Sequence, residues 1–517
     1  MKTLPIAATP IAAPKRTRRR FRLAAAGLVL VSAAVVGFPS YYWSRAWFRD
    51  RPVTEVLPAG YVDDASRLNR THVAETWSIP SDRESAERQL RELIDRARQQ
   101  NLHVAIGGAR HSMGGHTITP EGVVIDMLPF NHMELDAKRQ ILHVGAGARW
   151  SQIIPYLDAR GFSVAVMQSN NDFSVGGSIS VNCHGWQQNH APIASTVESL
   201  RLMKADGSIV TCSRRENREL FSLVLGGYGL LGVILHVDLQ VVANERYRAE
   251  VETVAADRYA TRFAEKVNAS PDIGMVYGRL CVVPGEKTFL RHAVLTVFRQ
   301  APCDAKEIPA LTSPQLSSLR RAVYRAQLGS DVGKELRWRA EKMFGEQISK
   351  NYVSRNQLLD EEAAVYQEKN ADRTDILHEY FIPTKRVPDF LSRAHEVIPR
   401  HDVDLLNVTI RNLREDHDSF LRYADQDLFA FVMLFSQART PEAERQMQSL
   451  TTELIEAALA CGGRYYLPYR LHATKEQFAR AYPQTAEFFK RKRQYDPTGL
   501  FENQFSLKYG EKPDQKQ

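Results

Sequence analysis

Cysteine is scarce in this chain and scattered along it. The 517 residues include five cysteines, an odd number with no Cys-x-x-Cys pair, which excludes a disulfide-stapled scaffold and a structural zinc site. The sequence also lacks internal repeats and low-complexity tracts, which argues against a solenoid. Hydrophobic residues make up 44% and charged residues 25%, as in ordinary globular proteins. Because a domain usually holds roughly 100–200 residues, we expect two or three domains.

Basic residues are not spread over the chain, although its net charge is +8. They gather at the N-terminus and in one later helical stretch, so we expect no nucleic-acid partner. Metal ligation is also not expected, because no two histidines stand at helical spacing with a carboxylate partner. The histidines considered for this role are His111, His116, His132, His143, His184 and His190.

One long apolar run, Leu23–Phe38, stands near the N-terminus behind the basic cluster of residues 15–22. A helix over residues 23–43 would measure about 30 Å, enough to span a bilayer, with the body beyond Arg45 on the periplasmic side. Residues 17–21 also resemble a twin-arginine export motif. No small-x-small cleavage site follows, so an uncleaved membrane anchor is favoured over a cleaved signal, and a buried soluble helix is the third reading.

The rest of the chain has a mixed pattern of helices and strands. Residues 81–100 predict an amphipathic helix that begins at Ser81. Short β-type runs separated by glycine fill residues 102–242, and Ser178–Val181 is expected to be one of these strands. Beyond Asn244, strands alternate with long helical stretches. We therefore predict an α+β protein with a second mixed domain.

Three glycine-rich segments lie in the first of these domains, at residues 106–116, 170–178 and 226–232. Successive amides without Cβ atoms nearby form concavities that hold a diphosphate. The third segment contains a formal Gly-x-Gly-x-x-Gly at Gly227, but a helical stretch precedes it and a strand follows. A Rossmann fingerprint needs the reverse order, so we reject a Rossmann fold.

Four ordered segments resemble the FAD-binding domain of the vanillyl-alcohol oxidase and p-cresol methylhydroxylase (PCMH-type) family. Residues 108–112 match a Gly-x-Gly-His-Ser flavin loop with Arg110 in place of the second glycine. The other matches are residues 174–185, 223–233 and 495–503. Within the family, the chain is most similar to sugar-alcohol and aldonolactone oxidases and to decaprenylphosphoryl-ribose oxidase.

The resemblance implies a domain plan. It comprises a basic tail and anchor (1–50), a two-subdomain FAD-binding domain (51–245), a mixed α/β substrate-binding cap domain (246–460) and a C-terminal return to the FAD-binding domain (461–517).

FAD is the cofactor that the resemblance implies. In the oxidase branch a histidine of the first loop bonds covalently to the flavin, and His111 occupies that position. The substituted Arg110 and the nearby His116 leave two alternatives open, attachment through His116 or a non-covalent flavin. The residues implied to contact FAD are Gly107, Gly108, Ala109, Arg110, His111, Ser112, Met113, His116, Ser174, Gly176, Gly177, Ser178, His184, Gly185, Val233 and Asn503.

Substrate-side residues are expected on the second domain. The family transfers a hydride from a carbinol carbon to the flavin while a base removes the hydroxyl proton. Asn407, Thr409 and Arg411 alternate with apolar residues, so one strand face presents an amide, a hydroxyl and a guanidinium. Relatives place an arginine on a comparable strand, and a half-exposed strand is the competing reading. Glu379 is either a site residue or a charge at a sheet edge.

Residues 464–472 fit a return strand on which relatives carry an active-site lysine, and this chain has none there. Tyr469, Arg470 or His472 would have to replace it. His184 and His472 are the candidate general bases, because imidazole titrates near neutral pH. The predicted catalytic set is His184, Arg411, Tyr469 and His472.

A basic amphipathic stretch covers residues 313–347, with Ser313 and Pro314 as its cap and first helical residue. Such a helix either lies on an anionic bilayer or, as we favour, packs on its own domain.

These observations predict an FAD-dependent oxidoreductase that oxidises a hydroxyl of a polyol, sugar or aldonolactone. Its electrons would pass to oxygen or to a membrane quinone. Two alternatives stay open: a flavin subunit for epimerase-type oxidation of a polyprenyl-linked sugar, and a non-catalytic flavin-fold binding module.

Overall fold

The computed structural model describes residues 40–41, 44, 56–188, 190–312, 317–348 and 350–510. The predicted membrane segment and the Ser313–Pro314 cap therefore lie almost wholly outside it. Within the described ranges, no helix is both long and apolar enough to cross a membrane.

The first part of the chain forms a small parallel sheet with a helix beside it. Its strand order is β3 (Glu75–Ser78), β5 (Val123–Asp126) and β4 (Val104–Gly107), next to the two-stranded β1 (Tyr61–Val62) and β2 (Thr71–His72). Helix α3 (Arg83–Gln99) buries its predicted apolar stripe. Its N-cap is Asp82, whose carboxylate accepts from the Ser85 amide at 2.8 Å, not the predicted Ser81; an aspartate is an equally good cap.

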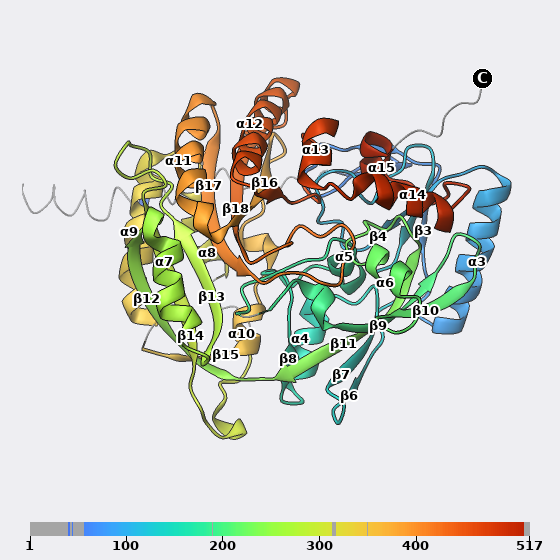
Figure 1. Cartoon of the computed structure of the whole chain (residues 1–517), viewed down its shortest axis with the longest axis horizontal. Helices are drawn as coiled ribbons and strands as arrows, with labels where there is room; N and C mark the ends of the chain where they lie inside the picture. Colours follow the sequence, from blue (N-terminus) through green and yellow to red (C-terminus); the bar gives the residue numbers. More distant parts are fainter. Residues whose placement is uncertain are drawn as a thin grey trace, which may run out of the picture.

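A larger antiparallel sheet completes the first domain, so this domain has two subdomains (Figure 1). The prediction of Ser178–Val181 as a strand is wrong: this segment belongs to a helix that starts directly after the extended Ser174. The sheet order is β10 (Ile209–Ser213), β9 (Val197–Met203), β11 (Val233–Ala243), β7 (Ile141–Gly145) and β6 (Met133–Asp136), with β8 (Phe162–Val164) on β11 and with helices α4 (Trp150–Asp158), α5 (Val175–Ser180) and α6 (Arg218–Val224) around it.

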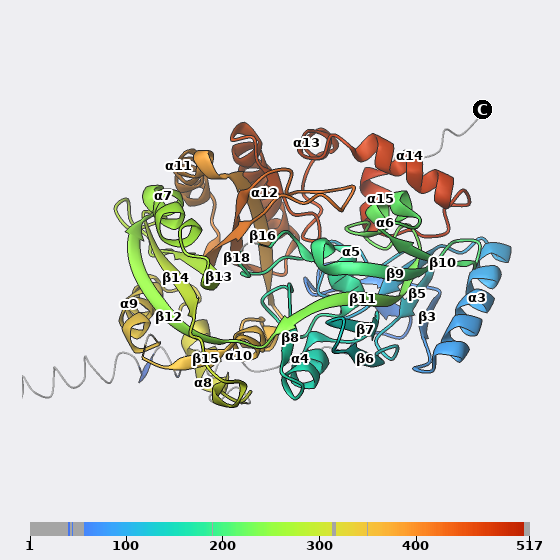
Figure 2. The ribbon, with the colours of Figure 1, turned by 60° about the horizontal axis from the view of Figure 1, so that its bottom comes forward.

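An eight-stranded antiparallel sheet forms the second domain. Figure 2 shows α7, α11 and α12 on one side of it and α8 and α9 on the other. The strand order is β15 (Tyr352–Ser354), β12 (Arg246–Ala255), β14 (His292–Gln300), β13 (Ile273–Leu280), β17 (Asp404–Leu413), β18 (Leu428–Ala438), β16 (Arg373–Pro383) and β19 (Arg464–Tyr465); the helices are α7 (Tyr259–Phe263), α10 (Arg355–Leu359), α11 (Val387–Val397) and α12 (Pro441–Ala460).

The basic stretch is two helices, α8 (Ser317–Arg325) and α9 (Asp331–Ile348), not one. The chain turns between them at Gly329, whose φ is +58°. Several of its cations face the protein: Arg325 pairs with Glu368 and Asp375, and Lys334 lies 2.7 Å from Asp404. These pairs favour the reading in which the stretch packs on its own domain.

After β19 the chain returns to the first domain through α13 (Lys475–Ala481), α14 (Thr485–Tyr495) and α15 (Gln504–Tyr509). The Val104 amide donates to the Leu500 carbonyl at 2.7 Å, and the Glu502 amide donates to the Val104 carbonyl at 3.1 Å. The last described residues thus extend the edge of the small parallel sheet at β4.

Candidate active site

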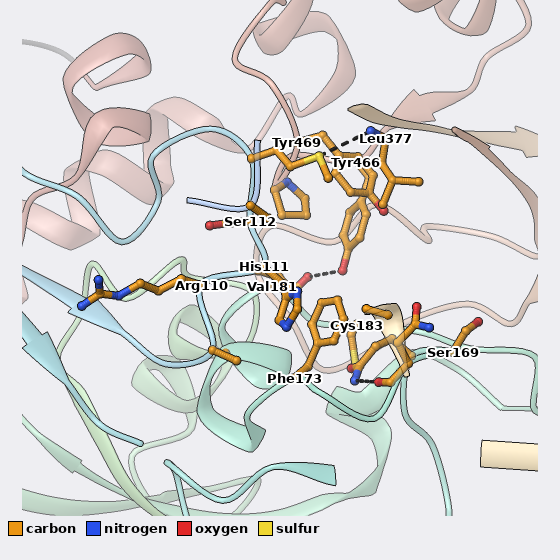
Figure 3. A pocket seen from close by; sticks show the side chains of 18 of the residues that line it. Arg110, His111, Ser112, Ser169, Phe173, Val181, Cys183, Leu377, Tyr466 and Tyr469 are labelled. Atoms are coloured by element: carbon orange, nitrogen blue, oxygen red, sulfur yellow. Dashed lines mark hydrogen bonds between the residues drawn. The ribbon is translucent and has the colours of Figure 1, made fainter. Parts of the chain in front are cut away.

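A cavity of about 380 Å³ lies between the two domains. One side is formed by the loop after β4 and by the segment around α5, and the other by β13, β16, β17 and the C-terminal return. Figure 3 shows His111 and Phe173 of the first domain near Tyr466 and Tyr469 of the return segment, while Arg110 extends away from them.

Part of the first-domain side of this cavity is bare backbone. In the described structure the amides of Gly108, Arg110, His111 and Gly177 donate to no protein acceptor. The loop and α5 lie so close that a Cβ on Gly108 would stand 2.1 Å from Ser174 Oγ. This arrangement of free amides fits the diphosphate of a dinucleotide.

Arg110 occupies the place of the family's second glycine. Its φ of +55° lies in the left-handed region, which costs a residue with a Cβ roughly 1–2 kcal/mol. The turn that glycine would make easily is therefore kept despite the substitution. Burial lowers the pKa of Arg110, and the charge of Asp126 opposes this.

His111 and His116 differ in environment. His111 is half-buried, lines the cavity and stacks on Phe173 with ring centroids 4.1 Å apart, and burial lowers its pKa. His116 is buried between Tyr228 and Phe505, with ring centroids at 5.4 and 5.6 Å. Burial lowers its pKa to about 3.

The predicted cofactor residues divide into two groups. Gly107–Met113, His116, Ser174, Gly176, Gly177 and His184 line the cavity, whereas Ser178, Gly185, Val233 and Asn503 do not. Ser178 and Asn503 contact residues around the cavity. Ser178 Oγ accepts from Trp150 at 2.9 Å, and Asn503 donates to the carbonyls of His116 and Tyr228 at 2.9 Å.

On β17 the predicted alternation brings Asn407, Thr409 and Arg411 to the cavity together. Arg411 Nη2 donates to Ser169 Oγ at 2.7 Å and Nη1 donates to the His184 carbonyl at 3.3 Å. Its buried Nε has no hydrogen-bond partner in the described structure. An unpaired buried donor costs about 1–3 kcal/mol, so this guanidinium is available to a substrate oxygen.

His184 and Glu379, which are buried, and Tyr469, which is half-buried, form a cluster that also lines the cavity. His184 Nε2 lies 2.5 Å from Glu379 Oε1, with side chains 2% and 1% exposed, although the pair is poorly aligned for a hydrogen bond. Tyr469 Oη donates to Glu379 Oε2 at 3.1 Å, and burial raises the pKa of Tyr469 well above its usual value. A carboxylate, an imidazole and a phenol in contact can hold and pass a proton.

Sequence reasoning left Glu379 undecided, because strand alternation alone does not say which sheet face is covered. His472 does not line the cavity. It contacts Glu444 through Nε2 and Thr451 through Nδ1, both at 2.8 Å, and burial lowers its pKa. Arg470 also binds Glu444 and donates to the Met113 carbonyl at 3.1 Å, which links the cap to the flavin loop.

Comparison with known families gives two matches that together cover both domains. Residues 85–213 match an FAD binding domain. Residues 281–509 match the family described as D-arabinono-1,4-lactone oxidase.

Individual relatives agree with these matches. L-gulonolactone oxidase of Mus musculus is 35% identical over 155 residues, which are 30% of this chain and 35% of that protein. D-arabinono-1,4-lactone oxidase of Debaryomyces hansenii is 29% identical over 182 residues, 33% of each chain, and cytokinin dehydrogenase 1 of Arabidopsis thaliana is 30% identical over 149 residues, 28% of this chain and 26% of that one. The chain thus spans about a third of the length of the curated relatives it matches.

The first-domain match and the amide cradle define an FAD-binding protein. With the second match, the chain is similar to the FAD-linked oxidases of the PCMH type, on the aldonolactone oxidase side of that family.

Proposed function

We propose that this protein is an FAD-dependent oxidase of a hydroxyl-bearing carbon in an aldonolactone. One observation carries the proposal: a single cavity joins the free amides of the flavin loop to Arg411 and to the His184–Glu379–Tyr469 cluster. The match of residues 281–509 and the gulonolactone and arabinonolactone oxidase relatives support a lactone over other alcohols.

The bound FAD supplies the hydride acceptor for this chemistry. Arg411, with its free Nε, orients the substrate by donating to an oxygen next to the reacting carbon and stabilises negative charge there. The His184–Glu379 pair accepts the hydroxyl proton, and Tyr469 fixes the carboxylate from its other oxygen. The surrounding buried aromatic residues exclude water from this proton transfer.

Anaerobic titration tests the proposal. L-gulono-1,4-lactone and D-arabinono-1,4-lactone are expected to bleach the flavin absorbance near 450 nm, and Arg411→Met is expected to slow the bleaching at least a hundredfold. Arg201→Gln, which removes a surface guanidinium paired with Glu87, serves as the control. A flavin that no lactone or polyol reduces would overturn the function.

Oxygen is the proposed electron acceptor, in line with the oxidase relatives. Peroxide formed in equal amount to lactone consumed supports it, whereas turnover only with a quinone would contradict it.

His111 is the proposed attachment point for a covalent flavin, because it is half-buried at the cavity beside Phe173, whereas His116, which also lines the cavity, is buried between Tyr228 and Phe505. If the flavin is covalent, acid precipitation should give a yellow protein pellet, and the tryptic peptide that carries the flavin should contain His111. His111→Ala should release the colour to the supernatant; an unchanged yellow pellet in that variant would point to His116.

Membrane anchoring through residues 23–43 remains a proposal that rests on sequence alone. Cell fractionation should find the full chain in membranes and a chain lacking residues 1–50 in the soluble fraction.

A further inference from the structure

The end of the cavity remote from the flavin loop has a construction of its own. It is lined by Tyr277 and Arg279 from β13, Asn407 from β17, Tyr324 from α8 and Tyr366 from the turn after residues 363–365. The edge-to-face pair Tyr324–Tyr366 has ring centroids 4.9 Å apart. We call these five residues the distal subsite.

Arg279 is held in one orientation but is not saturated. Its Nε lies 2.5 Å from a Glu341 carboxylate oxygen, and its Nη1 donates to Asn407 Oδ1 at 2.5 Å. In the described structure its Nη2 has no hydrogen-bond partner. Because Arg279 lines the cavity, this remaining edge of the guanidinium is free for an acceptor.

Tyr324 provides a second, independent sign of a ligand. Its side chain lines the cavity, the residue is 5% exposed, and its hydroxyl has no hydrogen-bond partner in the described structure. Arg337 covers the back of the ring with its guanidinium carbon 4.6 Å from the centroid. Buried hydroxyl groups normally have a hydrogen-bond partner. The unpartnered Tyr324 hydroxyl is therefore a binding position for a hydrogen-bonding group inside the cavity.

Four arginines and four carboxylates surround this end, and one of the arginines has no carboxylate bonded to it. Glu341 is paired with Arg279, Glu361 with Arg320, and both Glu368 and Asp375 with Arg325. Arg337 bonds only neutral acceptors among the described residues. Its guanidinium lies against the Tyr324 ring and donates to Asn407 Oδ1, and this local positive charge favours an anionic group over a neutral hydroxyl at the distal subsite.

We infer that the distal subsite binds an anionic oxygen group, a carboxylate or a phosphate, at the end of the substrate remote from the oxidised carbon. Arg279 Nη2 and Tyr324 Oη are its two donors, and Arg337 supplies the supporting charge. The inference rests on the proposed function and narrows the substrate to a lactone or sugar that bears such a group. Tyr324 and Arg337 come from α8 and α9, so these helices serve substrate selection.

Isothermal titration of the FAD-loaded protein tests the subsite without turnover. D-glucarate and D-sorbitol 6-phosphate represent the carboxylate and the phosphate, and D-sorbitol is the neutral probe. At least one anion should bind about tenfold or more tightly than sorbitol, and the tighter anion identifies the source of the charge. Tyr324→Phe and Arg279→Gln should each weaken that anion about tenfold and leave sorbitol unchanged.

Two variants outside the cavity serve as controls. Tyr259→Phe removes another buried phenol of the cap domain, and Arg262→Gln removes a surface guanidinium; neither should change anion affinity. Equal affinity for sorbitol and both anions, or unchanged anion affinity in Tyr324→Phe and Arg279→Gln, overturns the subsite.

The same materials separate the two proposals. If neutral lactones bleach the flavin and anions bind no more tightly than sorbitol, the proposed function stands and the distal subsite falls. If anions bind through Arg279 and Tyr324 while no lactone bleaches the flavin, the subsite stands and the function falls.

Discussion

The two sides of the cavity differ in what they present: free backbone amides on the first-domain side and side chains on the cap side. The first-domain side includes a patch of free backbone amides, supplied by the loop after β4 and by the start of α5, with Ala109 and Ser174 in contact although 65 residues separate them. The cap side consists of side chains from β13, α8, β16, β17 and the return segment. Backbone amides of one domain can hold a common cofactor whatever the side chains are, whereas substrate recognition depends on the side chains of the other domain and can vary independently.

Removing the close approach at Gly108 should have the largest effect. In Gly108→Val, a Cβ placed 2.1 Å from Ser174 Oγ displaces that hydroxyl, and a branched side chain stands among the free amides of the cavity, so we expect purified protein with little flavin. The ratio of absorbance at 450 nm to that at 280 nm measures the flavin content. Gly329→Ala is the control, because its φ is +58° but a methyl there meets nothing within 4 Å. Full flavin content in Gly108→Val would refute the backbone cradle.

A substitution on the cap side should slow flavin reduction without releasing the flavin. Glu379→Gln should keep the flavin but slow its anaerobic reduction by about a hundredfold or more, as loss of a general base does. Glu444→Gln changes the corresponding group beside His472, outside the cavity, and should leave the reduction rate within about threefold. Stopped-flow absorbance measures both rates. Equal rates in the two variants would remove Glu379 from the chemistry.

Acid should destabilise both sides through buried neutral histidines. Burial lowers the pKa of His116 on the flavin side and of His378 in the cap to about 3. The unfolded chain therefore binds more protons as pH falls from about 6.5 towards 3, and the free energy of unfolding decreases, by up to ~1.4 kcal/mol per pH unit for each histidine.

Urea denaturation at pH 7, 6 and 5 checks this dependence. His378→Gln should flatten it relative to the unchanged chain, whereas His417→Gln at an exposed site should not. Parallel dependences in all three proteins would contradict the neutral buried state.

The smallest effect is expected at Arg110. Arg110→Gly removes the strain at φ +55° but makes the unfolded chain more flexible, so the free energy of unfolding should change by less than about 1 kcal/mol. Arg110→Val keeps the strain and adds a branched side chain, and should be less stable than Arg110→Gly by more than about 1 kcal/mol. Calorimetry of both variants tests this order.

The sequence allowed more of the flavin side to be predicted than of the cap side. Gly108 and His111 stand in a local pattern, and the alternation of Asn407, Thr409 and Arg411 follows from strand geometry. The role of α5 was missed because six residues with two glycines carry little helical pattern. Only tertiary contacts place Glu379, Tyr324 and Arg279 at the cavity. The same is true of the position of His472 outside it, so neither could be predicted from local sequence.

The C-terminal return has a consequence for the order of synthesis. Leu500 and Glu502 bond the edge of β4, and Asn503 donates to the His116 carbonyl. The first domain therefore completes these contacts only after the C-terminal residues have been synthesised. A ribosome-bound nascent chain ending before residue 496 would hold an unfinished sheet edge and a loosened flavin loop. We therefore expect FAD to bind only after both domains have been translated.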